Sequence, residues 1–215
     1  MNAALYSSAR LAGILVSFVL VFTGLLASVY HLTAPAIQAS LAAERLAFLN
    51  EVLPQKYYDN DLLDDVLVLP PTPELGQAVA STVYRARIAG EPTALALEAI
   101  APDGYSGNIR MILGITFDGT ITGVRIIEHR ETPGLGDYID LKKDKNKKYP
   151  WILQFDGLNY PLVPDAQWKV QKDHGRFYYM TGATVSPRAV IAAVHKAARF
   201  VVLHRDELFA GETAP

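Results

Sequence analysis

The feature that most limits how this chain can fold is an uninterrupted apolar run near the N-terminus. From Leu11 to Leu32 the sequence contains no Asp, Glu, Lys or Arg. At a rise of about 1.5 Å per residue, a helix over this run crosses the roughly 30 Å hydrocarbon core of a bilayer. The sequence therefore predicts a single transmembrane helix, with the lipid bilayer as its partner.

The charges that flank this run predict its orientation. Arg10 and the N-terminal amine precede it, and the next charged residue after it is Glu44. The positive-inside rule then places the N-terminus in the cytoplasm and the rest of the chain outside it. The alternative is a cleaved signal peptide with a processing site near Ala34–Ala36. The apolar run is longer than the roughly 7 to 15 residues typical of such a peptide, so we favour a retained anchor.

Composition narrows the chemistry of the remaining chain. The protein has 215 residues, half of them hydrophobic, and a net charge of -2, which gives no reason to expect nucleic acid as a partner. It contains no cysteine, which excludes disulfides, cysteine-ligated iron-sulfur clusters and thiolate zinc sites. The five histidines are scattered, so no metal or haem site is predicted. No serine, histidine and acid arrangement indicates a hydrolytic site. Redox chemistry in this chain would have to come from an organic cofactor or from a haem held by His or Met, and no haem ligand is assigned.

Sequence patterns divide the chain into an anchor at 1–33, a helical and irregular connector at 34–75, and a domain at 76–215. In the connector, a helix is expected to resume after Pro35 and an irregular segment to follow at Asp59–Pro73. Alternating apolar and polar residues predict four strands in two hairpins, at 82–88, 94–100, 109–117 and 120–128. The predicted fold class is α+β, an antiparallel sheet with packed helices behind one N-terminal transmembrane helix.

The last predicted helix runs from Ser186 to about His204. Ser186 is a favourable N-cap, and Pro187 suits the first helical position. The residues just before it are small, and Thr184 places a hydroxyl near the helix start. A helix start favours a bound anion such as phosphate. A small-residue loop before a capped helix is also common where nothing binds, so the pattern alone leaves both interpretations open.

A second glycine-containing loop follows the last predicted strand, at Glu131–Gly136. Its Pro-Gly turn can expose consecutive backbone N–H groups to an acceptor-rich ligand. An earlier connector, Asp103–Gly107, contains Tyr105 and is flexible enough to contact the same ligand. Lys142–Lys148 reads as a solvated loop, with docking to an acidic subunit as the alternative. Four aromatic residues downstream are expected to pack in or near the core: Trp151, Phe155, Tyr160 and Trp168.

Taken together, these loops resemble the RnfG subunit of the Rnf ferredoxin:NAD oxidoreductase and, more distantly, the NqrC subunit of the sodium-pumping NADH:quinone reductase. One of the shared motifs is the threonine-glycine-alanine-threonine stretch at 181–184, and in that family the phosphate of FMN esterifies its last threonine. The resemblance therefore implies an FMN-binding domain with covalent FMN on Thr184. It also implies cofactor contacts from three stretches of this sequence: Thr181, Gly182, Ala183 and Val185; Glu131, Thr132, Pro133, Gly134, Leu135 and Gly136; and Tyr105.

The resemblance also implies a cellular location and partners for the chain. This would be a bacterial inner-membrane electron-transfer subunit with a periplasmic domain, which does not turn over alone. Its partners would be the other Rnf subunits and a flavin transferase. The family's acceptor pattern usually has an aspartate where this chain has Tyr178, although Asp173 lies nearby in the sequence. Two alternatives remain: an NqrC-type subunit, and a membrane-anchored scaffold without a redox role, which Tyr178 favours.

Overall fold

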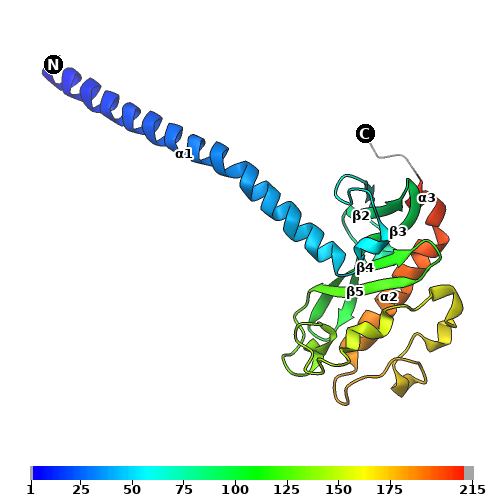
Figure 1. The fold of residues 1–215 in the computed structure, drawn as a ribbon. Helices are drawn as coiled ribbons and strands as arrows, with labels where there is room; N and C mark the ends of the chain where they lie inside the picture. The colour runs from blue at the N-terminus through cyan, green and yellow to red at the C-terminus, as the bar shows by residue number, and fades with distance from the viewer. Residues whose placement is uncertain (1, 211–215) are drawn as a thin grey trace. The chain divides into compact units, whose positions relative to one another are not determined.

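The computed structural model describes residues 2–210 (Figure 1). Residue 1 of the predicted anchor and residues 211–215 of the predicted FMN-binding domain lie outside them. Contacts divide the chain into two compact units, Met1–Arg45 and Leu46–Pro215. We describe each unit by itself.

The first unit lies within one helix, α1 (Asn2–Asn50), which is long and apolar enough to cross a membrane. The expected interruption at Pro35 is absent, because the helix continues through this proline. Hydroxyl groups inside the apolar run donate to carbonyls of the preceding turn, including Ser17 to Gly13 at 2.9 Å and Ser28 to Gly24 at 2.7 Å. These hydroxyls therefore need no water, as a lipid environment requires.

The second unit is built on a five-stranded sheet. Its strands pair in sequence order and each pair is antiparallel, which confirms the predicted α+β class. The strands are β1 (Val66–Leu69), β2 (Ser81–Ile88), β3 (Glu91–Gly104), β4 (Gly107–Thr116) and β5 (Ile121–Glu128).

Two expectations about the sheet were wrong. β1 lies inside Asp59–Pro73, which was expected to be irregular, because its four residues are too few to show a period between the acidic and proline-rich flanks. The Asp103–Gly107 connector is a tight hairpin in which Gly104 pairs with Gly107. Tyr105 therefore sits at the tip of a paired ladder.

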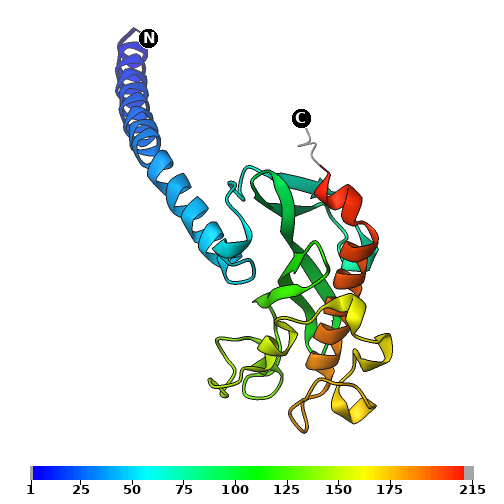
Figure 2. The same ribbon diagram turned by 45° about the vertical axis from the view of Figure 1, so that its right-hand side comes forward.

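The larger core lies between the sheet and helix α2 (Val185–Leu203). One row across the sheet joins Val83, Leu97, Leu113 and Val124, and all four are buried. α2 runs along this face and short helix α3 (Arg205–Phe209) follows it (Figure 2). Trp151, Phe155 and Trp168 are buried in the same cluster, and Tyr160 packs against it, as expected from the sequence.

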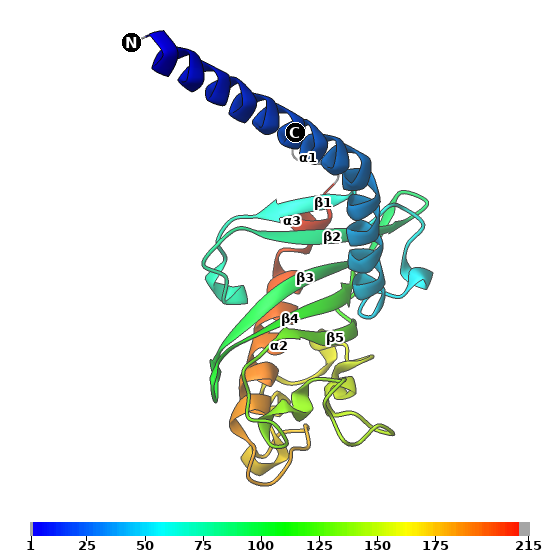
Figure 3. The same ribbon diagram turned by 90° about the vertical axis from the view of Figure 1, so that its left-hand side faces the viewer.

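The opposite face of the sheet is covered by the last turn of α1 and the chain that follows it (Figure 3). Leu49, Val52 and Leu53 of this segment are buried. Two glycines allow this close packing. A Cβ on Gly114 would come within 2.2 Å of the Val52 carbonyl oxygen, and one on Gly123 within 3.0 Å of the Val52 Cα. The backbone at Val52 therefore rests directly on the sheet, and Thr122 donates a hydrogen bond to its carbonyl.

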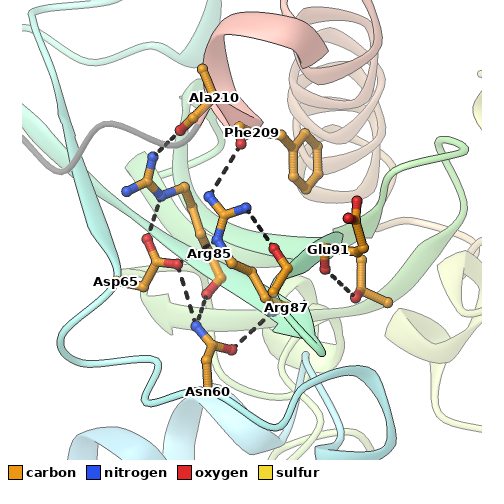
Figure 4. A network of polar contacts seen from close by, with 9 residues as sticks. Asn60, Asp65, Arg85, Arg87, Glu91, Phe209 and Ala210 are labelled. Carbon is orange, nitrogen blue, oxygen red and sulfur yellow. Dashed lines mark hydrogen bonds and ion pairs between the residues drawn. The ribbon is translucent and has the colours of Figure 1, made fainter.

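A buried arginine ties the end of α3 to the sheet (Figure 4). The Arg85 side chain is only 2% exposed; its Nε lies 2.6 Å from Asp65 Oδ1 and its Nη1 donates to the Ala210 carbonyl at 2.5 Å. Arg87 donates to the other Asp65 oxygen at 2.7 Å and to the Phe209 carbonyl at 3.2 Å. One carboxylate thus orients two arginines that hold the end of α3.

Candidate functional site

The residues singled out in the sequence meet around a cavity of about 270 Å³. Three segments form its wall: the β3–β4 hairpin, the loop after β5 and the start of α2. The lining residues are Tyr105, Glu131, Thr132, Leu135, Gly136, Gly182, Ala183, Thr184, Val185 and Ser186. Of the residues predicted from the sequence, Thr181, Pro133 and Gly134 are not part of this lining. Ser186 is an addition, because the sequence had suggested only a capping role for it.

The predicted N-cap was wrong. α2 begins at Val185, and Thr184 occupies the N-cap position without a side-chain capping hydrogen bond. Ser186 lies inside the first turn, is 2% exposed and donates its hydroxyl to Glu131. The intrinsic preference of serine for the N-cap yields here to a buried carboxylate, which is the stronger acceptor.

The start of α2 has the features of an anion site. Within residues 2–210 no acceptor is found for the backbone N–H groups of Thr184, Val185 and Ser186, and the Thr184 hydroxyl makes no hydrogen bond. Free N–H groups and the positive end of the helix dipole favour a phosphate group. Gly182 has φ +89° and no atom within 4 Å of an added Cβ, so a ligand can approach the start of α2 from the side of Gly182.

Tyr138, a residue that the sequence did not single out, fixes the loop before α2. Its hydroxyl donates to the Ala183 carbonyl at 3.0 Å and accepts from the Met180 N–H at 3.1 Å. Burial raises the pKa of Tyr138 to about 12, so the phenol stays protonated and can keep donating at neutral pH. No sequence spacing links Tyr138 to this loop, because the contact depends on how the two segments pack.

We expect Tyr138→Phe to destabilise the domain by about 1–3 kcal/mol, because the Met180 N–H and the Ala183 carbonyl would lose their partner in a buried site. Urea unfolding followed by tryptophan fluorescence would measure this change. Tyr160→Phe is the matched control, because the half-buried Tyr160 hydroxyl makes no hydrogen bond within the described chain. Equal stability of the two variants would contradict the role of Tyr138.

The loop at Glu131–Gly136 does not present its backbone as expected. The Gly134 N–H donates to Asp137 at 2.8 Å, and the N–H groups of Leu135 and Gly136 donate to the Thr132 carbonyl. The expectation of free backbone donors was therefore wrong, because the turn satisfies its own N–H groups. What the loop offers to the cavity is the side chain of Leu135, which is 49% exposed, and that of Thr132.

Glu131 was expected to contact the cofactor through its side chain, but its carboxylate accepts three hydrogen bonds from the protein. They come from the backbone N–H of Tyr105 at 3.2 Å, the N–H of Ser106 at 3.0 Å and the Ser186 hydroxyl. The residue is only 3% exposed, although it forms part of the cavity wall. One buried side chain thus joins all three segments of the site.

Tyr178 and Asp173 lie outside the cavity lining. Tyr178 donates from its backbone to Gln154 at 2.9 Å and from its hydroxyl to the Tyr149 carbonyl at 3.0 Å. Asp173 accepts two hydrogen bonds from Arg188 at 2.6 and 2.7 Å, and this pairing holds the pKa of Asp173 below its usual range. Both side chains therefore have structural partners of their own.

The lysine-rich loop is exposed at each of its five lysines. It is held in shape by Asp144, which is 4% exposed and accepts the N–H groups of Trp151 at 2.7 Å and Asn146 at 2.8 Å. This agrees with a solvated loop of fixed conformation.

Comparison with known proteins places this architecture in a family. Residues 104–199 match the model of the FMN-binding domain, and residues 1–52 match the model of the RnfG N-terminal region. The G subunit of the ion-translocating oxidoreductase complex of Vibrio cholerae strain M66-2 is 46% identical over 195 residues, which cover 91% of this chain and 90% of that protein. The chain belongs to the RnfG family.

Other RnfG relatives match over a similar extent. The relative of the same name from Pseudomonas aeruginosa strain UCBPP-PA14 is 43% identical over 208 residues, covering 97% of this chain and 95% of that protein. The crystal structure of Shewanella oneidensis NqrC is 22% identical with a TM-score of 0.42, covering 60% of this chain and 61% of that one. The matched FMN-binding segment contains every residue that lines the cavity.

Proposed function

We propose that this RnfG-family chain is a membrane-anchored subunit that carries FMN covalently on Thr184 and relays electrons within an ion-translocating ferredoxin:NAD oxidoreductase complex. The observation that carries this proposal is a threonine hydroxyl at the N-terminus of α2 that has no hydrogen-bond partner among residues 2–210 and lies in the cavity of the FMN-binding segment. A bound flavin supplies the capacity to exchange one or two electrons, while the protein positions it and tunes its potential.

The residues at the cavity fit each part of this cofactor. The N–H groups at the start of α2 suit its phosphate, and the exposed side chains of Leu135 and Tyr105 offer apolar surface to its ring system. The cavity of about 270 Å³ lies near the lower end of the roughly 300–1,000 Å³ typical of ligand pockets, and two of its lining residues, Tyr105 and Leu135, are exposed. We therefore expect the site to cover part of the flavin and leave an edge accessible for electron exchange.

Attachment at Thr184 requires an activated donor, which we propose is a flavin dinucleotide used by a flavin transferase. The bond from Thr184 Oγ1 to the flavin phosphorus forms as the phosphoanhydride bond breaks. The nucleoside monophosphate leaves, and the hydroxyl proton is released to solvent. Intact mass of the protein from its own host tests this step. We expect an increase equal to FMN less one water, mapped to the peptide that contains Thr184. An unmodified mass in the assembled complex would refute covalent attachment.

We further propose that the FMN-binding domain lies in the periplasm, because Arg10 precedes an uncharged membrane segment. Covalent attachment suits this location, where no FMN pool would refill an empty site by mass action. A fluorescent reporter that matures only in the cytoplasm should be dark when fused after Pro215 and bright when fused before Met1. Fluorescence of the C-terminal fusion would reverse the proposed orientation.

The other interpretations make different predictions. An NqrC-type assignment is less favoured, because the matched N-terminal model and the curated relatives above are of the RnfG type. A scaffold without a redox role predicts a colourless protein. A purified yellow protein that keeps its colour after denaturation agrees only with the redox proposal.

A further inference from the structure

The carboxylate of Glu131 is a charged group in the cavity wall that is held by three hydrogen bonds from the protein. It lies in the loop after β5, yet its three donors belong to the β3–β4 hairpin and to the first turn of α2. These are the two other segments of the cavity wall. The relative positions of the three wall segments therefore depend directly on this one carboxylate, whereas a contact within one segment fixes only that segment.

Two glycines make the space that this carboxylate occupies. A Cβ on Gly104 would lie 2.9 Å from Glu131 Oε1 and only 2.2 Å from the Gly107 carbonyl oxygen. A Cβ on Gly136 would lie 2.6 Å from Ser186 Oγ and 3.0 Å from Glu131 Oε2. Neither glycine has a positive φ, so crowding rather than backbone conformation explains the absence of a side chain at both positions.

The donors to Glu131 are all neutral: two backbone amides and one hydroxyl. Among residues 10–210 no lysine, arginine or histidine forms an ion pair with it. A group that accepts hydrogen bonds from three donors behaves as a carboxylate. A negative charge without a paired cation is therefore fixed in the wall of the cavity, where its burial reduces screening by solvent and strengthens its effect on a bound group.

We infer that Glu131 is the positioning residue of the flavin site. By engaging the Ser186 hydroxyl, it leaves Thr184 as the free hydroxyl at the start of α2. By holding the Tyr105–Ser106 hairpin tip against α2, it fixes the cavity around that hydroxyl. Its charge disfavours the additional negative charge of reduced flavin and so lowers the flavin potential. This inference rests on the proposed attachment of FMN to Thr184.

The test compares Glu131→Gln with Asp144→Asn in the full chain. Both are buried carboxylates that accept two backbone N–H groups, but Asp144 does not line the cavity. With flavin transferase and a flavin dinucleotide, we expect Glu131→Gln to slow attachment by about tenfold to a hundredfold, because a reacting group misplaced by about 1 Å can cost up to about a hundredfold in rate. Redox titration of the loaded fraction should give a higher midpoint potential. Asp144→Asn should match the wild type in both measurements.

Equal attachment rates and equal potentials in Glu131→Gln and Asp144→Asn would overturn the inference, because Glu131 would then have only a general structural role. If Glu131→Gln does not fold, Ser186→Ala replaces it, since it removes one of the three donors and keeps both amides. Ser186→Ala should slow attachment severalfold relative to Asp144→Asn, and an unchanged rate would likewise overturn the inference. A wild-type protein that takes up no flavin would instead refute the proposed function.

Discussion

Thr184→Ala is expected to abolish covalent FMN while the protein remains folded and in the membrane. The Thr184 hydroxyl makes no capping hydrogen bond, so its loss should not incur the roughly 1 kcal/mol typical of removing an N-cap side chain. The phosphate ester, by contrast, has no other oxygen at the same place in the motif. Intact mass and in-gel flavin fluorescence would measure the loss, and circular dichroism would test the fold. Electron transfer through the complex should stop at this subunit.

Thr181→Ala is the matched control for that variant. Thr181 belongs to the same short loop but does not line the cavity, so its replacement should leave the flavin in place. Thr184→Ser keeps a hydroxyl and should retain partial attachment. Covalent FMN that persists in Thr184→Ala would refute the assignment, and peptide mapping would then identify the true acceptor, with Ser186 and Thr132 as the other aliphatic hydroxyls in the wall.

Arg85→Ala should cause a large loss of stability, about 3–5 kcal/mol, because it removes the more buried of the two cations that compensate the Asp65 carboxylate. Asp65 would keep only Arg87 as a cation, and the Ala210 carbonyl would lose its donor. The end of α3 should loosen first, since Arg85 and Arg87 tether it. Urea unfolding would give the change in free energy, and hydrogen exchange would locate it.

Arg110→Ala is the corresponding control. Arg110 also contacts two acidic groups, Glu98 at 3.0 Å and Glu128 at 3.4 Å, but its side chain is 42% exposed. Exposed pairs contribute about 1 kcal/mol or less, so this variant should unfold close to the wild type. A similar loss in both variants would show that burial is not the reason for the effect at Arg85.

The fold was predictable wherever a period repeated long enough to be recognised. The strands from Thr82 to Glu128 and the apolar face of α2 have such periods, and the structure has them in sequence order. β1 has only four residues and is recognised as a strand through its pairing with β2, which the local sequence does not encode. The local sequence at Pro35 likewise did not predict the structure. Proline lacks a backbone N–H donor, but neighbouring turns maintain α1 through this position.

The structure brings most of the predicted site residues together around one cavity, but its hydrogen bonds differ from those expected from the sequence. The two glycine-containing loops indicated where the cavity would be, since small residues before a helix start are a local signal. Which polar groups remain without a hydrogen bond depends on contacts between segments that are distant in sequence. Ser186 was expected to cap α2 and instead bonds Glu131, while Tyr138 joins Met180 and Ala183 across 42 and 45 positions of sequence. Such pairings appear only after the chain has folded.

The contact between Val52 and the two sheet glycines limits where a protease can cleave the chain without exposing the core of the domain. Leu49, Val52 and Leu53 supply part of the second core, together with Leu62, Ala86 and Ile112. A protease that cleaved just after Leu53 would release a sheet with one apolar face uncovered, and such surfaces promote aggregation. Cleavage before Leu46 would keep that cover. The segment that leaves the membrane is therefore also a structural wall of the domain, and the chain has no dispensable spacer at this point.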